Sequence, residues 1–231
     1  MGEVLIFPEI FEGDPVKAFF TGKEPGADLA RVADIGRIKK ELIYTPIQRH
    51  TSEVIIIGSE PLPPPLIGDA VITGRKGIML GIQVADCVPV LLFDRVKRVI
   101  SAVHAGWRGT ASGILIKTIM TMKERFSCNP LDLVIAMGPS IRWCCYKVGS
   151  EVIEAVTRIT GEGEYILQRD GQYCLDLPSA NRQQALKMGV PGENIWISEF
   201  CTFCEHERFY SYRFSKAERG RQGGFIHNML S

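Results

Sequence analysis

Three apolar runs rich in β-branched residues follow one another in the middle of the chain, and they constrain its fold most. They span residues 77–84, Val88–Phe93 and Val99–Val103, and only short polar segments separate them. A strand with one face in solvent alternates apolar and polar residues, whereas these runs are almost continuously apolar. We therefore predict three strands that lie in the core of the fold.

The third run ends at His104 and leads into a glycine-bracketed turn. We predict that Thr110 or Ser112 then caps a helix that continues to about Phe126. Ligands of open α/β sheets bind where a strand is followed by a helix. Arg108 lies beside the predicted helix N-terminus, whose free N–H groups also favour an anion. This turn is therefore a candidate binding site.

Strands and helices alternate irregularly along the rest of the chain. Further strands are predicted at Val4–Phe7, Val16–Phe20, Val54–Ile57, Asp69–Thr73, Leu131–Met137 and Ile195–Ser198. Further helices are predicted from a cap at Asp28 to about Leu42, over Glu151–Ile159 and over Pro178–Met188. The two kinds of element are mixed rather than segregated, and several strands are consecutive. We predict one α/β (α+β) domain over residues 1–231, with mixed β-sheets flanked by helices.

The charge balance argues against nucleic acid or a membrane surface as a partner. The chain of 231 residues has 27 Lys and Arg against 26 Asp and Glu, a net charge of +1. Residues 1–8 lack the cationic region of a signal peptide, and no apolar run approaches the roughly 20 residues of a spanning helix. We therefore expect a cytoplasmic protein.

Seven cysteines in such a protein are thiols or metal ligands rather than disulfides. The simplest interpretation of four of them is as small buried apolar residues: Cys128, Cys144, Cys145 and Cys174. Cys201-x-x-Cys204-x-His206 has the C-x-x-C spacing of a structural zinc knuckle. It lacks a second ligand pair of the usual spacing, so it is a rival rather than the preferred metal site.

Two of the four histidines and one cysteine stand at the ends of predicted core strands. His50 precedes one strand, His104 ends another, and Cys87 lies between two of the apolar runs. Neutral imidazole and thiolate are ligands that zinc prefers, and three protein ligands leave a fourth position open. Their spacing does not show that they converge. The same residues would also serve without metal, with Cys87 as nucleophile and His104 as its base.

Several motifs in the chain resemble the laccase-domain family, whose members were first called multicopper polyphenol oxidoreductases and are now described as zinc-dependent purine nucleoside phosphorylases. The motifs are Ala85-Asp-Cys-Val-Pro-Val, Val103-His-Ala-Gly-Trp-Arg-Gly, Met137-Gly-Pro-Ser-Ile, Cys145-Tyr-Lys-Val-Gly, Cys201-Thr-Phe-Cys and Phe209-Tyr-Ser-Tyr-Arg with Gly220-Arg. The resemblance covers roughly residues 43 to 231. It implies a fold like the catalytic domain of cytotoxic necrotising factors, and His50, Cys87 and His104 as zinc ligands.

The resemblance also implies an activity on purine nucleosides. Phosphorolysis of adenosine, guanosine, inosine and S-methyl-5'-thioadenosine would be accompanied by adenosine deamination, with nucleosides and phosphate as the small-molecule partners. Arg108 would hold phosphate, and Asp86 would transfer a proton or support Cys87. The chain is expected to be a monomer or a small homo-oligomer. Arg49 and Thr51 depart from the family's pattern around His50, and the loop at residues 22–26 is short.

Three other functions remain open at this point. One is a Cys–His hydrolase or deamidase without metal. Another is a copper-dependent polyphenol oxidase, which is less favoured because four histidines in the whole chain supply few copper ligands. The third is a non-enzymatic module that senses a nucleoside. Metal analysis of the purified protein separates zinc from copper and from a metal-free site.

Overall fold

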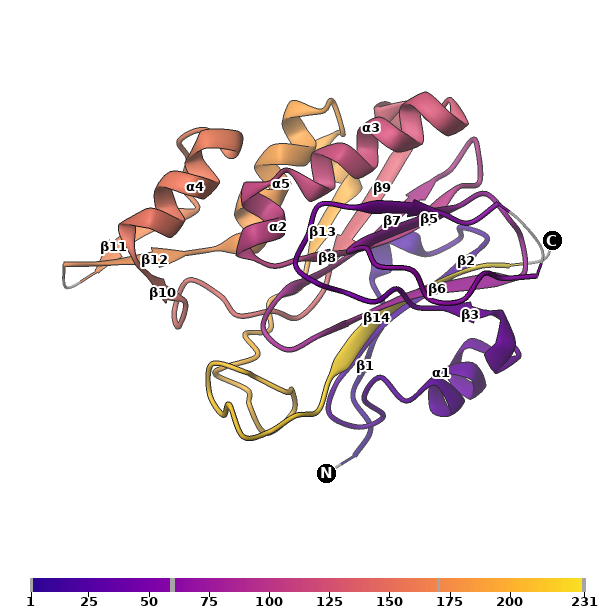
Figure 1. Ribbon diagram of the computed structural model, residues 1–231, viewed down its shortest axis with the longest axis horizontal. Helices are drawn as coiled ribbons and strands as arrows, with labels where there is room; N and C mark the ends of the chain where they lie inside the picture. Colours follow the sequence, from indigo (N-terminus) through magenta and orange to yellow (C-terminus); the bar gives the residue numbers. More distant parts are fainter. Residues whose placement is uncertain (1, 59–60, 170, 230–231) are drawn as a thin grey trace.

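Two large β-sheets lie face to face at the centre of the molecule (Figure 1). The structure is a computed structural model that describes residues 2–58, 61–169 and 171–229. In the first sheet the strand order is β13 (Ile195–Ile197), β9 (Leu133–Met137), β7 (Val88–Asp94), β8 (Ile100–Ala105), β5 (Ala70–Thr73) and β4 (Val54–Ile56). In the second it is β1 (Leu5–Ile6), β2 (Val16–Thr21), β14 (Gln222–Asn228), β6 (Ile78–Val84) and β3 (Ile43–Tyr44). Each sheet contains parallel and antiparallel pairs.

The apolar runs are buried on both faces, as their composition predicts. On β7, Leu91 and Phe93 pack between the two sheets, where they meet residues such as Phe20 of β2. Val90 and Leu92 of the same strand face the helices on the outer side of the first sheet. Alternate side chains of a strand point to opposite faces, so a run covered on both faces must be apolar throughout.

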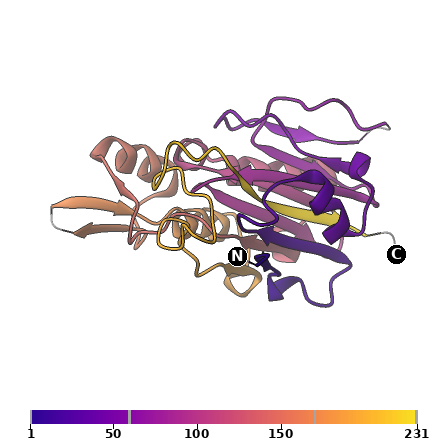
Figure 2. The same ribbon diagram turned by 90° about the horizontal axis from the view of Figure 1, so that it is seen from below.

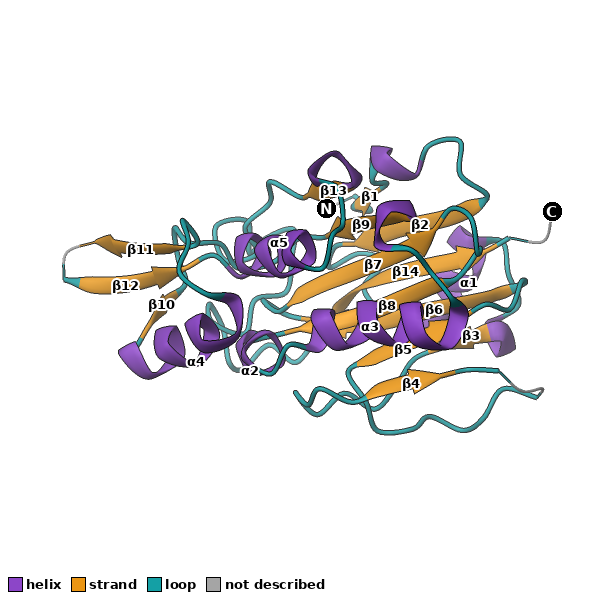
Figure 3. Cartoon of the chain, turned by 90° about the horizontal axis from the view of Figure 1, so that it is seen from above, coloured by secondary structure: helices purple, strands orange, loops and turns teal. Residues whose placement is uncertain are grey.

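Helices complete two outer layers (Figure 3). The outer face of the first sheet is covered by α2 (Trp107–Ala111), α3 (Ile114–Phe126) and α5 (Leu177–Lys187). The outer face of the second sheet is covered by α1 (Leu29–Gly36). Helix α4 (Ser150–Thr160) packs beside a small sheet with the order β10 (Lys147–Val148), β12 (Gln172–Leu175), β11 (Ile166–Arg169). Short 3-10 turns lie at Glu9–Phe11, Lys40–Leu42, Pro130–Asp132 and Gly192–Asn194. The predicted mixed α/β fold with flanking helices is confirmed.

The segment around His104 differs from the prediction in its boundaries. Strand β8 continues through His104 to Ala105, and helix α2 begins at Trp107 rather than at Thr110 or Ser112. Gly113 has φ +68° and separates α2 from α3, because left-handed backbone ends a right-handed helix. Arg108 is therefore the second residue of a five-residue helix. The predicted helix corresponds to α3, which begins just after Ser112 and ends at Phe126 as predicted, and α2 is an additional short helix before it.

Helix α1 begins as predicted and ends early. The Asp28 carboxylate accepts hydrogen bonds from Ala30 N at 2.8 Å and Arg31 N at 3.1 Å, which is N-capping. The helix stops at Gly36 because Arg37 is left-handed, with φ 51°. The segment up to Leu42 is instead a loop with a 3-10 turn.

Strand β14 was not predicted, although it lies inside the second sheet between β2 and β6 (Figure 2, yellow). Its start contains Gly223 and Gly224, which lower strand propensity. The backbone needs both glycines here. A Cβ on Gly223 would lie 2.7 Å from the Ile82 carbonyl oxygen, and one on Gly224 would lie 2.9 Å from the Phe20 ring. Close approach of neighbouring strands and sheets thus explains residues that look like a loop in the sequence.

Among the helices of the described residues, none has the length and apolar composition needed to cross a membrane.

Candidate metal centre

Strands β7 and β8 place Cys87 and His104 side by side. Cys87 directly precedes β7, and in the antiparallel β7–β8 pair Pro89 lies opposite His104. Asp86, before Cys87, has φ 81°, so the chain turns sharply into the strand. Gly106 makes room for the thiol, because a Cβ on Gly106 would lie only 2.8 Å from Cys87 Sγ.

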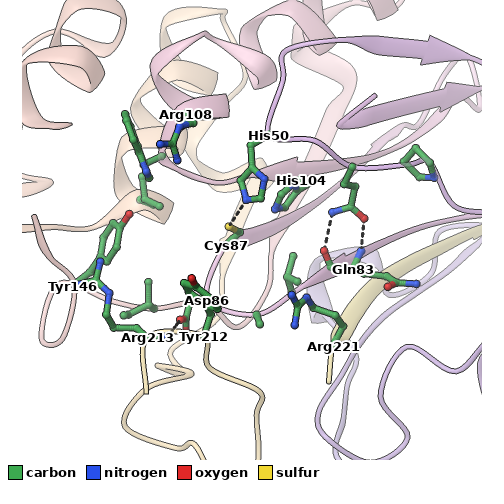
Figure 4. A pocket seen from close by; sticks show the side chains of 17 residues that line it. His50, Gln83, Asp86, Cys87, His104, Arg108, Tyr146, Tyr212, Arg213 and Arg221 are labelled. Carbon is green, nitrogen blue, oxygen red and sulfur yellow. Dashed lines mark hydrogen bonds between the residues drawn. The ribbon is translucent and has the colours of Figure 1, made fainter. Parts of the chain in front are cut away.

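His50 comes from the loop between β3 and β4, and an amide pair anchors that loop. Gln48 Nε2 donates to the Gln83 carbonyl oxygen at 2.7 Å, and Gln83 N donates to Gln48 Oε1 at 2.8 Å (Figure 4). The side chain of Gln48 thus binds the backbone of β6 as a neighbouring strand would. His50 itself has φ 57°, a left-handed conformation that turns its ring toward Cys87.

The structure brings the three predicted ligands together. The candidate ligand atoms of His50, Cys87 and His104 all lie within 4.8 Å of one another. Cys87 Sγ lies 3.9 Å from His50 Nε2, and the two imidazole rings are 4.8 Å apart between centroids at an angle of 74°. The side chains range from exposed at His50 to buried at His104, so the centre opens on one side.

Asp69 organises both histidines, a role that sequence reasoning missed. His104 Nδ1 hydrogen bonds to Asp69 Oδ1 at 2.8 Å. The same carboxylate accepts hydrogen bonds from the amides of Arg49, His50 and Thr51 and from the Thr51 hydroxyl, at 2.7–3.2 Å. The sequence offered only an Asp at the start of an apolar strand, and the structure shows that this Asp is fully buried. Because Nδ1 of His104 is engaged, Nε2 is left as its ligand atom.

Burial and charge act against each other at this centre. Burial raises the pKa of the Cys87 thiol, but the imidazoles of His104 and His50 outweigh it and lower the pKa to about 6. Burial lowers the pKa of His104, but Cys87 and Asp69 outweigh it and raise the pKa to about 9. For Asp69, burial raises the pKa, and hydrogen bonds from His104 and Thr51 hold it well below its usual range. Cys87 is therefore poised as a thiolate, the form that binds metal or attacks as a nucleophile.

The three residues line a cavity of about 620 Å³ that also contains cationic and aromatic side chains (Figure 4). Arg108 lies on its wall with the guanidinium 4.4 Å from the centre of the Trp107 ring. Arg213 and Arg221, which belong to the family motifs but were given no role from the sequence, line the same cavity. Both belong to the segment before β14, more than a hundred residues beyond Arg108. The cavity suits a small ligand that carries negative charge.

Asp86 lines the cavity but already has two hydrogen-bond partners. Thr202 Oγ1 donates to Asp86 Oδ1 at 2.7 Å, and Arg213 N donates to Asp86 Oδ2 at 2.6 Å. Asp86 thereby fixes the segment that carries Arg213. These contacts support a positioning role, and proton transfer by Asp86 stays a prediction.

The cysteines differ in part from the prediction. Cys128 and Cys174 are buried as expected, but Cys144 is exposed and Cys145 is half-buried. Both lie in the turn after β9 rather than in a core element, which is why they escape burial. His206 does not join Cys201 and Cys204: its ring stacks on Phe214 with centroids 3.6 Å apart.

The fold and the site together define a mixed α/β protein with a His–Cys–His centre in a cationic pocket. The chain belongs to the multi-copper polyphenol oxidoreductase laccase family, whose model matches residues 26–228.

Two relatives and one solved structure place the chain within this family. It is 36% identical over 206 residues to a purine nucleoside phosphorylase of Bacteroides thetaiotaomicron, covering 84% of this chain and 76% of the relative. It is 38% identical over 156 residues to adenosine deaminase RL5 of an unknown prokaryotic organism, covering 66% of this chain and 59% of that protein. The crystal structure of YlmD from Geobacillus stearothermophilus superposes with a TM-score of 0.88 at 28% identity and covers 96% of this chain and 94% of the other.

The donor set of the centre fits zinc. It offers two imidazole nitrogens and one thiolate sulfur, and a carboxylate orients one of the imidazoles. The other two histidines lie elsewhere: His206 stacks on Phe214, and His227 is buried in β14. A site of several copper ions would need more imidazoles than this centre has.

Proposed function

We propose that the protein is a zinc-dependent purine nucleoside phosphorylase that also deaminates adenosine. The observation that carries this proposal is the convergence of His50, Cys87 and His104 in a pocket whose wall holds three arginines. The names of the relatives, purine nucleoside phosphorylase and adenosine deaminase, support purine nucleosides as substrates. The proposed substrates are adenosine, guanosine, inosine and S-methyl-5'-thioadenosine, with inorganic phosphate as co-substrate.

The residues divide the work of the proposed reactions. His50, Cys87 and His104 would hold zinc, which when bound makes hydroxide available near neutral pH and polarises a substrate oxygen. Arg108 would bind phosphate, since a guanidinium forms paired, charge-assisted hydrogen bonds with it. Its guanidinium stacks on Trp107 and has no carboxylate partner among the described residues, so it is available to an anion. Asp86 would keep Arg213 at the cavity wall.

A Cys–His hydrolase is the second candidate, because one specific observation favours it. Cys87 Sγ lies 3.9 Å from His50 Nε2 and is poised as a thiolate, as in enzymes that use a Cys–His pair. In that case the cysteine would attack the substrate and no metal would be needed. The two candidates predict opposite effects of metal removal on activity: the zinc enzyme would lose its activity, and the Cys–His hydrolase would keep it.

Chelation tests the zinc proposal. We expect purified protein to release hypoxanthine from inosine in a phosphate-dependent reaction, and a strong chelator to abolish this activity and expose Cys87 to alkylation. Added zinc should restore activity, because metal holds and shields the thiolate. Cys87→Ala should be inactive with or without zinc. Full activity after verified zinc removal would reject the proposal and favour the Cys–His hydrolase.

A further inference from the structure

Four cysteines from two distant segments meet outside the pocket. Cys144 and Cys145 lie in the turn between β9 and β10, and Cys201 and Cys204 lie in the turn that follows β13. All four sulfur atoms lie within 4.8 Å of one another. Within this four-cysteine cluster, Cys204 Sγ is 3.6 Å from Cys144 Sγ and 3.3 Å from Cys145 Sγ. The C-x-x-C pair therefore has the partner pair that its sequence spacing does not reveal.

The sulfur spacing matches a tetrahedral thiolate site. Zinc bound by four thiolates has Zn–S distances of about 2.3 Å, so the edges of the tetrahedron are about 3.8 Å long. Sulfur contacts of 3.3 and 3.6 Å, with every remaining pair within 4.8 Å, lie close to that geometry. A single disulfide would use two of the four sulfurs and would not account for the other two. Convergence of all four favours a common central ion.

The backbone around Cys201 is arranged to stabilise a thiolate. Arg142 N donates to Cys201 Sγ at 3.4 Å. The amides of Phe203 and Cys204 also face this sulfur, as in a C-x-x-C turn around a metal. Amide donors favour a charged sulfur over a neutral thiol. The cluster thus has donors aimed at a ligand sulfur as well as four ligands.

We propose that Cys144, Cys145, Cys201 and Cys204 bind a zinc ion, in a second metal site separate from His50, Cys87 and His104. Four protein ligands close the coordination shell, so the ion is structural and leaves no position for substrate. The site joins two segments that form the pocket wall. Tyr146 follows one ligand pair and lines the cavity, and Thr202 lies within the other and holds Asp86.

Metal analysis of matched variants tests this site. We expect wild type to contain about two zinc ions per chain and Cys87→Ala to contain about one. The paired variants Cys144→Ser/Cys145→Ser and Cys201→Ser/Cys204→Ser should each lose about one. His206→Ala is the matched control, because His206 neighbours the cluster without being a ligand, and it should keep both ions.

Cobalt substitution provides a readout that does not alter the cluster. Cys87→Ala retains all four sulfurs, so after replacement of zinc by Co²⁺ it should show the intense visible absorption of a tetrahedral cobalt thiolate. The result stands even where the paired serine variants fail to fold. Wild type with about one zinc, all of it lost in Cys87→Ala, would overturn the second site. So would iron in place of zinc, or a Cys–Cys disulfide within the cluster that persists when the protein is purified in the presence of a reductant.

The same measurements separate this inference from the proposed function. If the four-cysteine cluster does not bind zinc, Cys87→Ala will contain no zinc. If His50, Cys87 and His104 do not bind zinc, Cys87→Ala will contain as much zinc as wild type.

Discussion

At the scale of single residues, the centre depends on one fully buried carboxylate, that of Asp69. Asp69 holds the His104 ring and accepts three consecutive backbone amides around His50. It therefore sets the positions of His50 and His104, which are 54 residues apart in the sequence. The departures from the family's pattern at Arg49 and Thr51 do not disturb this arrangement. The Thr51 hydroxyl adds a hydrogen bond to the same carboxylate.

Asp69→Asn should weaken zinc binding by about 10- to 100-fold. The amide replaces one acceptor oxygen by a donor, which would then face the N–H groups that surround it. Competition with a chromogenic chelator measures the affinity at fixed pH. Asp28→Asn is the control, because Asp28 accepts amides at the start of α1, away from the centre. Equal zinc affinity in wild type and Asp69→Asn would contradict the role given to Asp69.

Arg108→Ala separates phosphate binding from metal binding. Loss of a charged hydrogen bond is expected to cost about 1.5–3 kcal/mol in phosphorolysis, seen as a raised KM for phosphate. Deamination of adenosine uses water and no phosphate, so it should fall by less. Both reactions and the zinc content are measured on the same preparation, with Arg125→Ala on the exposed end of α3 as control. If both activities and zinc fall together, Arg108 is a structural residue of its turn.

At the scale of elements, the turn between β8 and α2 packs against the centre with almost no spare room. Gly106 has extended backbone, φ −76° and ψ 174°, which any residue can adopt. Its requirement for glycine is steric, since a Cβ would meet Cys87 Sγ at 2.8 Å and His50 Cδ2 at 3.3 Å. Gly106, the first glycine of the His-Ala-Gly-Trp-Arg-Gly motif, is thus needed to leave room for the Cys87 sulfur.

Gly106→Ala should displace the Cys87 sulfur and lower zinc occupancy, with an overpacking cost of about 1–3 kcal/mol in the free energy of unfolding. Zinc content and urea denaturation of the same variant measure the two effects. Gly58→Ala is the matched control, because a Cβ at Gly58 meets no atom within 4 Å. A Gly106→Ala protein with full zinc occupancy and wild-type stability would show that the turn can relax.

The sequence predicted the parts of this centre that lie at strand ends and missed those that depend on packing between distant segments. Cys87 and His104 flank apolar runs, so periodicity locates them. Nothing in the spacing shows that Asp69 lies beneath both histidines. Arg213 and Arg221 reach the cavity only because the segment before β14 folds back over it. Likewise, Cys144 and Cys145 meet Cys201 and Cys204 through tertiary structure, so their pairing has no sequence signature.

At the scale of the whole molecule, the two large sheets are held together by aromatic residues between them. Phe20 of β2 is fully buried and stacks on Trp196 of β13, with ring centroids 6.2 Å apart and an interplanar angle of 9°. Gly138 and Gly224 both lie against the Phe20 ring, and a Cβ on either would clash with it. The pocket receives residues from both sheets, including Gln83 of β6 and His104 of β8.

Phe20→Ala should therefore reduce the stability of the whole fold by about 3–5 kcal/mol, because it leaves a cavity between the sheets. Unfolding in urea, followed by tryptophan fluorescence and circular dichroism, measures the change. Phe7→Ala is the control, since Phe7 is 54% exposed, and it should cost about 0.5 kcal/mol. A similar loss in both variants would mean that Phe20 is not a central contact between the sheets.

The place of β14 has a consequence for how the protein is made. This strand, residues 222–228, pairs on one side with β2 at residues 16–21 and on the other with β6 at residues 78–84. On a ribosome, β2 and β6 therefore emerge long before the strand that lies between them. Until residue 228 leaves the exit tunnel, both strands have an unpaired edge, and such edges join other chains. We therefore expect a chain that stops before residue 222 to aggregate rather than to form a smaller folded protein, because β2 and β6 each lack the strand that pairs with them.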